Sequence, residues 1–172
     1  MVEKNLIVDA YAISYKGLFD LKGLLDTINS ISAKRGYATS EKRRVEKTVE
    51  TGRELYMEIR AMKRKQAEHD LALNIRVDLK NIEDAEVSIN KVPARIEKGD
   101  VKISIDAWEL TEYQWRWEQT PWYVFLKSLY DKFIKKVTGK YHGELISDAH
   151  YIGENIKAYL ELHKYMVKPR NP

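Results

Sequence analysis

Apolar and polar residues alternate along several stretches of the chain, a pattern that predicts β-strands with one buried face. The alternation is clearest between residues 71 and 80, and it recurs over residues 5–15, 54–65 and 101–107. We predict that Arg76 faces solvent and that the core receives the apolar residues around it: Leu71, Leu73, Ile75, Val77 and Leu79.

Residues 37–50 form the most polar segment, and their pattern fits two structures. Val45 and Val49 are four residues apart, as they would be on one face of a helix. The alternation of the segment, together with Thr51-Gly52 as a turn signal, favours an exposed strand. We predict the strand and keep the helix as the alternative.

Two polar segments, 66–70 and 81–84, predict turns between strands. The second turn would make Val87 and Ile89 part of a separate short strand. Pro93 would then end that strand or place it at the edge of the sheet, because proline cannot donate a ladder hydrogen bond.

Apolar residues recur at helical spacing near the N-terminus, between residues 19 and 31. Asp20 is a candidate N-cap for this helix, since its side chain can accept from the first free backbone N–H groups. Gly36 is the candidate residue after its end, where a left-handed conformation suits glycine.

A second helix is predicted to begin at Thr120-Pro121, because threonine can cap and proline fits the first helical position. We expect this helix to fold back onto the sheet. Gly139 and Gly143 predict a link to a third helix over 145–163. The apolar positions of the second helix are Phe125, Leu126, Leu129, Tyr130, Phe133 and Val137.

The predicted elements run strand, helix, antiparallel meander and two helices, which is the α+β pattern. We predict a meander of five to six strands with one N-terminal and two C-terminal helices packed on it. A length of 172 residues suits one domain over residues 1–172, and residues 168–172 are expected to form a frayed tail.

The composition excludes a disordered chain, because 44% of the residues are hydrophobic. Charged residues reach 33%, a surplus typical of proteins from hot habitats. The absence of cysteine excludes disulfides and thiolate metal sites. We expect a cytoplasmic protein, since the first residues do not form a signal peptide and no apolar run is long enough to span a bilayer.

All four tryptophans lie between residues 99 and 137. They fit either the main core seam between helix and sheet or an aromatic surface for a flat ligand or a partner protein. Trp108 and Leu110 are apolar on the face opposite Ile105, so either both faces are covered or a bulge near Asp106 changes the register. The candidate binding residues are Trp108, Tyr113, Trp115, Trp117, Trp122 and Tyr123.

Basic residues form two triplets on neighbouring predicted strands. If the two strands pair across the turn after residue 50, the triplets meet at one end of the hairpin and form a positive patch for phosphates. The alternative is a solvated edge that discourages aggregation. The residues of this candidate patch are Lys42, Arg43, Arg44, Lys63, Arg64 and Lys65.

Catalytic motifs are absent from the sequence: there is no glycine-rich phosphate loop and no GxSxG elbow. The four histidines have no local partner at metal-ligand spacing, and we expect ordinary surface or core residues at His69, His142, His150 and His163. We therefore predict no metal, no cofactor and no catalytic residue.

The element order resembles the helix-grip fold of the START and Bet v 1-like families. The resemblance rests on NLIVDAYAISY, the helix FDLKGLLDTINSISAK, the meander up to DVKISIDAWEL and the helix that starts TPWYVFLKSLYDKF. It implies a pocket between helix and sheet for an apolar or lipid-like ligand, and it implies no catalytic residues. The two predicted C-terminal helices depart from the single long terminal helix of that family.

These observations favour a non-enzymatic binding or assembly module, with a homodimer formed through the aromatic residues or a strand edge. The first alternative is a carrier of an apolar ligand. The second is an RNA- or DNA-binding accessory protein, which the absence of an RNA-binding motif disfavours. An enzyme ranks last, because no nucleophile, base or metal site converges in the sequence.

Overall fold

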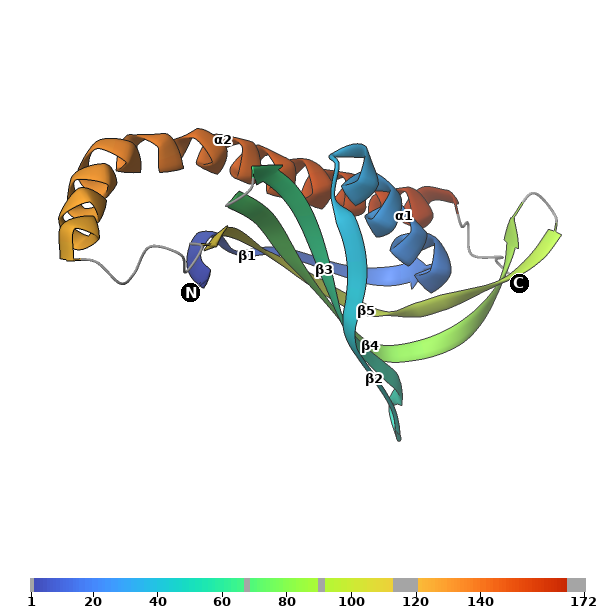
Figure 1. The fold of residues 1–172 in the computed structure, drawn as a ribbon. Helices are drawn as coiled ribbons and strands as arrows, with labels where there is room; N and C mark the ends of the chain where they lie inside the picture. The colour runs from blue at the N-terminus through green and yellow to red at the C-terminus, as the bar shows by residue number, and fades with distance from the viewer. Residues whose placement is uncertain (1, 67–68, 90–91, 113–120, 167–172) are drawn as a thin grey trace.

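The computed structural model describes the backbone of residues 2–66, 69–89, 92–112 and 121–166, and the side chains of residues 4–65, 69–87, 95–111 and 141–165. Five strands and two helices make up this part of the chain (Figure 1). In chain order they are β1 (Val2–Phe19), α1 (Leu21–Lys34), β2 (Ala38–Val49), β3 (Gly52–Gln66), β4 (His69–Ile89), β5 (Val92–Glu112) and α2 (Pro121–Met166).

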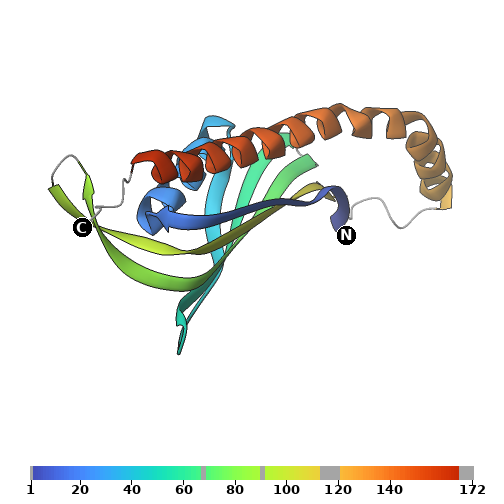
Figure 2. The same ribbon diagram turned by 180° about the vertical axis from the view of Figure 1, so that it is seen from behind.

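The strands form one antiparallel sheet in the order β1-β5-β4-β3-β2. Strands β2 to β5 form a meander, and β1 completes the sheet beside β5. Both helices lie on the same face of the curved sheet, and within the described part of the chain no helix lies on the other face (Figures 1 and 2). The predicted α+β class and the antiparallel meander are confirmed, and the segment 38–49 is the strand that we favoured.

The core lies between the helices and the sheet. The five apolar residues predicted on β4 are all completely buried, and Val101, Ile103 and Ile105 of β5 lie beside them. The strand period therefore identified the buried face correctly. The helices close the core with Leu24, Ile28, Ile31, Leu145, Ala149, Ile152, Ile156 and Leu160.

Helix α1 begins and ends as its sequence predicts. The Asp20 side chain caps the helix by accepting a hydrogen bond from the Lys22 backbone N–H at 3.1 Å. Gly36 has a φ of +82° just after the last turn, and its N–H donates to the Ala33 carbonyl. The two signals are local, so they could be recognised without knowledge of the tertiary structure.

The C-terminal region contains one helix of 46 residues, so the prediction of two helices was wrong. Gly139 and Gly143 both lie inside α2. A glycine costs a helix roughly 1 kcal/mol relative to alanine, which is too little to break one that continues in both directions. A Cβ atom added at Gly143 would meet no other atom within 4 Å.

We expect Gly143→Ala to raise the free energy of unfolding by about 0.5–1 kcal/mol, because alanine restricts the unfolded chain and fits the open space. The matched control is Gly153→Ala in the same helix, where the new Cβ would overlap the ring of Tyr11. That variant should be destabilised. Urea unfolding of the two variants measures both effects, and a destabilised Gly143→Ala would support a break in the helix.

The predicted turn at 81–84 was also wrong, because β4 continues through it as a bulge. The register with β5 shifts between Lys80 and Glu83, and Asn81 has a φ of +52°. Gly99 lies opposite the bulge, where a Cβ would approach the Lys80 carbonyl oxygen to 2.8 Å. A missing side chain on β5 thus makes room for the extra residue on β4.

The bulge changes the assignment of the residues that follow it. Val87 and Ile89 belong to β4 and are not part of a separate strand. Pro93 lies inside β5, opposite Ser88 of β4, so it does not end a strand. The pairing of β5 with β1 reaches only Glu97, so Pro93 lies where β5 is locally an edge, as its missing N–H requires.

Candidate functional site

The aromatic candidates fall largely outside the described side chains. Three of them lie in the undescribed segment before α2: Tyr113, Trp115 and Trp117. Two more lie at the start of α2, where only the backbone is described: Trp122 and Tyr123. The prediction that this helix start folds back onto the sheet was wrong, because the backbone of residues 121–140 continues past the end of the sheet (Figure 1). Trp108 is half-buried on the face opposite the core, and its Nε1 has no hydrogen-bond partner among the described residues.

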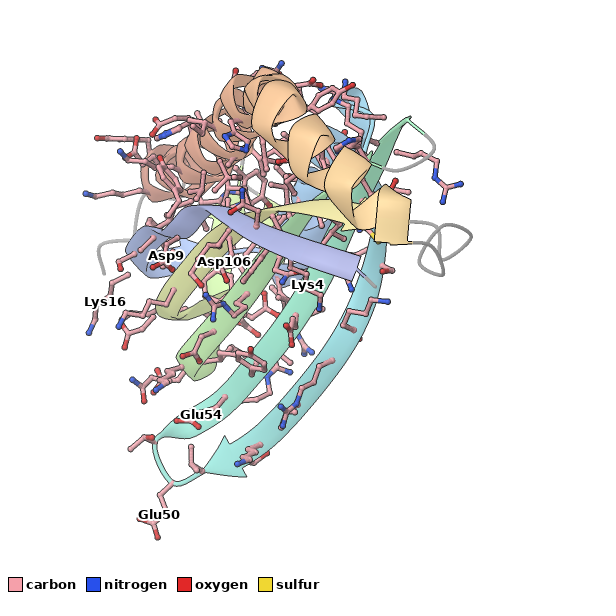
Figure 3. The ribbon with its side chains drawn as sticks, turned by 60° about the vertical axis from the view of Figure 1, so that its left-hand side comes forward. Lys4, Asp9, Lys16, Glu50, Glu54 and Asp106 are labelled. Carbon is pink, nitrogen blue, oxygen red and sulfur yellow. The ribbon has the colours of Figure 1, made fainter. Side chains whose placement is uncertain are left out.

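The bulge predicted near Asp106 lies in the neighbouring strand. Strand β5 pairs with β4 without a shift over residues 100–111, whereas β1 is irregular between residues 6 and 11. Asp106 stabilises that irregularity, because its Oδ1 accepts from the Ala10 N–H at 3.0 Å (Figure 3). The outer face of β5 is only partly covered near Trp108, because Trp108 is half-buried and Leu110 is buried there.

Asp106 also changes the interpretation of Arg76. The Arg76 Nη2 lies 2.7 and 2.9 Å from the two carboxylate oxygens of Asp106. Arg76 is on the face away from the core, as predicted, but it is one half of a charge-assisted pair. A negative charge at position 76 would lie beside Asp106, so this position is not an inert surface site.

The structure does not bring the two basic triplets together. Residues 42–44 are exposed on β2, where Arg43 and Arg44 pair with Glu58 and Met57 of β3. The second triplet, residues 63–65, lies further along β3, away from the hairpin turn. Its two lysines point to the helix side and both bond to a carboxylate of α2, so they do not add to an exposed patch.

The inner face of the sheet becomes polar at one end. In register across three strands lie Lys63, Leu71 and Glu109, and His69 follows opposite Thr111. Glu109 is only 1% exposed although it carries a carboxylate. Carboxylates are seldom fully buried without a partner, so this end of the interior is chemically distinct from the rest of the core.

Two histidines contact the buried carboxylate of Glu109, and we call these three residues the Glu109 cluster. His142 of α2 places its Nε2 3.0 Å from Glu109 Oε2. His69 of β4 places its Nδ1 3.6 Å from Glu109 Oε1, which is too long for a hydrogen bond. His69 Nδ1 and Glu109 Oε1 are both buried without a hydrogen-bond partner among the described residues. The His69 ring lies 5.9 Å from the ring of Tyr141.

A second polar group, the Asp148 network, adjoins the cluster along α2. Asp148 is 2% exposed, and its carboxylate accepts from the Tyr37 hydroxyl at 3.0 Å. Lys63 donates to Asp148 at 3.4 Å and to Glu144 at 2.7 Å. Arg35 lies 3.5 Å from the other oxygen of Asp148. The network connects the end of α1 and strand β3 to α2.

Three groups of the network, Tyr37, Lys63 and Glu144, have pKa values shifted so that each keeps its ordinary charge at neutral pH. Burial and the nearby Asp148 carboxylate raise the pKa of the Tyr37 hydroxyl well above its ordinary value. Burial alone would lower the pKa of the Lys63 ammonium, but its bonds to Glu144 and Asp148 outweigh burial and raise it. Burial acts to raise the pKa of Glu144, and the bonds from Lys63 and Lys65 lower it. The charges are mutually compensated, as expected of a structural network.

The sequence analysis missed both polar groups. It found no partner for His142, because Glu109 lies 33 residues away on a strand. If the alternation of Ile103 and Ile105 is extended to position 109, it places the Glu109 carboxylate in the core, where an apolar residue is expected. This conflict between the strand pattern and the residue type is the signal from which the site could have been found, because proteins break such rules of burial at functional sites.

A hollow of about 390 Å³ lies on the opposite face of the sheet, between β1, β5 and β4. Its walls carry charges of both signs, and these pair with each other: Lys16 lies 3.3 Å from Asp100, and Lys80 lies 3.9 Å from Asp78. The paired, exposed charges make this hollow a weaker candidate than the buried Glu109 cluster.

Among the described residues no group of three or more histidines, cysteines or carboxylates is arranged to hold a metal ion. The helices described here include none that is long and apolar enough to cross a membrane. Comparison with known proteins gave no match to a protein-family model, a curated protein or a solved structure.

Proposed function

We propose that this protein is a non-enzymatic binding module of the helix-grip type. It takes a small ligand at the polar end of its interior, where α2 lies over β4 and β5. The observation that carries the proposal is the Glu109 cluster, a buried carboxylate with two partly exposed imidazoles at one end of the core, in which Glu109 Oε1 and His69 Nδ1 have no hydrogen-bond partner among the described residues.

The topology supports the proposal. A meander with the first strand beside the last, and one long C-terminal helix across the sheet, is the arrangement that the resemblance implied. The single helix also removes the departure that two predicted helices had suggested. Likeness of fold alone does not define a ligand, so the chemistry has to come from the site.

The core packing limits where a ligand can bind. From Leu145 to Leu160 the buried hydrophobic residues of α2 are at most 1% exposed and form one cluster with the strands. Interiors of this kind are close-packed and leave few voids. The described side chains beneath this part of the helix pack tightly, which supports placing the ligand at the end where Glu109 replaces an apolar residue.

The cluster selects for a ligand that donates hydrogen bonds. Glu109 presents a buried carboxylate, and such a group gains most from a cationic or N–H donor. Tyr141 and Leu71 provide apolar surface beside it. A small amphipathic amine, with an ammonium group at the carboxylate and a short apolar tail, has the matching chemistry.

Hexylammonium is a suitable probe for this site. We expect it to raise the melting temperature, because a ligand that binds only the folded state stabilises it by mass action, by about 2.7 kcal/mol at one hundred times Kd. Hexanoate should have no such effect, because its carboxylate would meet that of Glu109. Differential scanning fluorimetry measures both shifts.

The variant Glu109→Gln should lose the response to hexylammonium, whereas the exposed control Glu86→Gln should keep it. Equal responses in the two variants, or equal responses to the ammonium and the carboxylate probe, would contradict the proposed site. A glutamine in place of Glu109 preserves size and one acceptor, so the comparison isolates the charge.

The surface features give less support to the other functions. Edge strand β2 carries several charged residues, which discourage pairing between edges and so argue against assembly through this strand. The separation of the basic triplets removes the main argument for nucleic acid. A small-ligand module is the function that the buried Glu109 carboxylate supports best.

A further inference from the structure

The first part of α2 extends beyond the sheet. Among the described side chains, those that α2 contributes to the core run from Tyr141 to Leu160. Residues 121–140 precede them, and their helical backbone continues past the end of the sheet and curves away from it (Figures 1 and 2). We call these twenty residues the projecting segment.

The positive charge of the chain is concentrated in the projecting segment. It contains a single acidic residue, Asp131, which leaves a net charge of +4. The whole chain also has a formal net charge of +4, so the rest of the chain carries no net charge. The basic residues of the segment are Lys127, Lys132, Lys135, Lys136 and Lys140.

The sequence of the projecting segment is amphipathic. At about 100° per residue nine of its apolar positions fall within one half of the helix circumference, and Lys127, Lys132 and Lys135 fall on the other half together with Val124. Lys136 lies just inside the apolar half, and Lys140, at the end of the segment, lies near its middle; long lysine side chains can extend from there toward the polar side. The nine apolar positions are Trp122, Tyr123, Phe125, Leu126, Leu129, Tyr130, Phe133, Ile134 and Val137.

We infer that the projecting segment docks on the surface of an anionic lipid bilayer. A helix with aromatic and leucine residues on one half and most of its lysines on the other, as here with three of five, lies in the interface plane with its apolar half below the headgroups. The lysines are attracted to the negative surface potential of anionic lipids. The inference is independent of the Glu109 cluster and of the function proposed above.

The charge and the apolar half of the projecting segment together favour a bilayer over other binding partners. A second copy would bring another segment of charge +4 against the first, and like charges oppose that contact. A nucleic acid would match the charge but would leave the apolar half of the helix in water. An anionic bilayer satisfies both halves, because it supplies negative headgroups and an apolar interior.

Co-sedimentation with vesicles tests the inference on the full chain. We expect binding to vesicles of phosphatidylcholine with about one third phosphatidylglycerol, weak binding to pure phosphatidylcholine, and a loss of binding as salt is raised. Tryptophan emission should shift to shorter wavelength on binding. Equal binding to both vesicle types, or tighter binding to a single-stranded RNA oligomer than to anionic vesicles, would overturn the inference.

The variant Lys127→Gln/Lys132→Gln/Lys135→Gln should weaken binding to anionic vesicles by roughly a hundredfold, given a factor of about five for each lysine near the surface. The matched control, Lys42→Gln/Arg43→Gln/Arg44→Gln, removes the same charge from exposed β2 and should bind within a few-fold of wild type. Equal losses in the two triple variants would contradict the inference. If the first variant unfolds in a thermal melt, Lys132→Gln alone, with an expected loss of roughly fivefold, decides the question in its place.

Discussion

Ile75→Asp is expected to unfold the protein. Ile75 is completely buried at the centre of β4, opposite Ile59 and Ile105 on the neighbouring strands. Aspartate would lose the packing of the isoleucine and place an unpaired charge in the core, a combined cost of about 5 kcal/mol or more. Folded domains are stable by only about 5–15 kcal/mol, so little or none of that stability would remain.

The neighbouring substitution Asn74→Asp provides the control. It creates the same residue on the same strand, but on the opposite face, in register with Arg60 and Asp106. The new carboxylate is repelled by Asp106 and attracted by Arg60 to a similar degree, so we expect a change in the free energy of unfolding of less than about 1 kcal/mol. Circular dichroism melts compare the two variants. Similar melting temperatures for Ile75→Asp and Asn74→Asp would contradict the assignment of the buried face.

Asp148→Ala should have the second largest effect. The Asp148 carboxylate is buried and bonds to Tyr37 and Lys63, with Arg35 beside it. Removing one partner of a buried ion pair costs about 3–5 kcal/mol, because the remaining groups stay buried without compensation. Urea unfolding at neutral pH measures this loss.

Two further variants show whether the loss comes from the buried network. Asp100→Ala removes an exposed carboxylate that pairs with Lys16, and it should change stability much less. The triple variant Tyr37→Phe/Lys63→Met/Asp148→Leu should recover much of the stability, since apolar replacement of a whole buried network is often neutral. A small effect of Asp148→Ala would show that the network is not buried as described.

The sequence predicted those parts of the fold that depend on local pattern. The alternation from Leu71 to Leu79 identified a strand and its buried face, because shifting a half-buried strand by one residue would move all its apolar side chains to the solvent. Asp20 and Gly36 identified both ends of α1 for the same reason: their signals involve only neighbouring backbone groups.

The errors arose where tertiary contacts outweighed local signals. Gly139 and Gly143 read as a link, yet the helix continues through both. Residues 81–84 read as a turn, but Gly99 on the adjacent strand leaves space for a bulge. Neither outcome can be deduced from its own segment, because each depends on what lies across the sheet or further along the helix.

The candidate site was less predictable than the fold. The number of aromatic residues made them the predicted site. The polar end of the interior depends instead on Glu109, a charged residue at a strand position where the alternation predicts an apolar one. Its partners His69 and His142 come from β4 and α2. Only the register of the sheet and the position of α2 bring them together.

A crystal structure of the protein soaked with hexylammonium tests the central claim most directly. The account predicts density for the probe between α2 and the ends of β4 and β5, with its nitrogen about 2.7–2.9 Å from the Glu109 carboxylate. Glu109→Gln crystals treated in the same way should lack that density. Density for the probe only elsewhere, or a Glu109 region filled by the protein's own side chains, would contradict the proposed binding site.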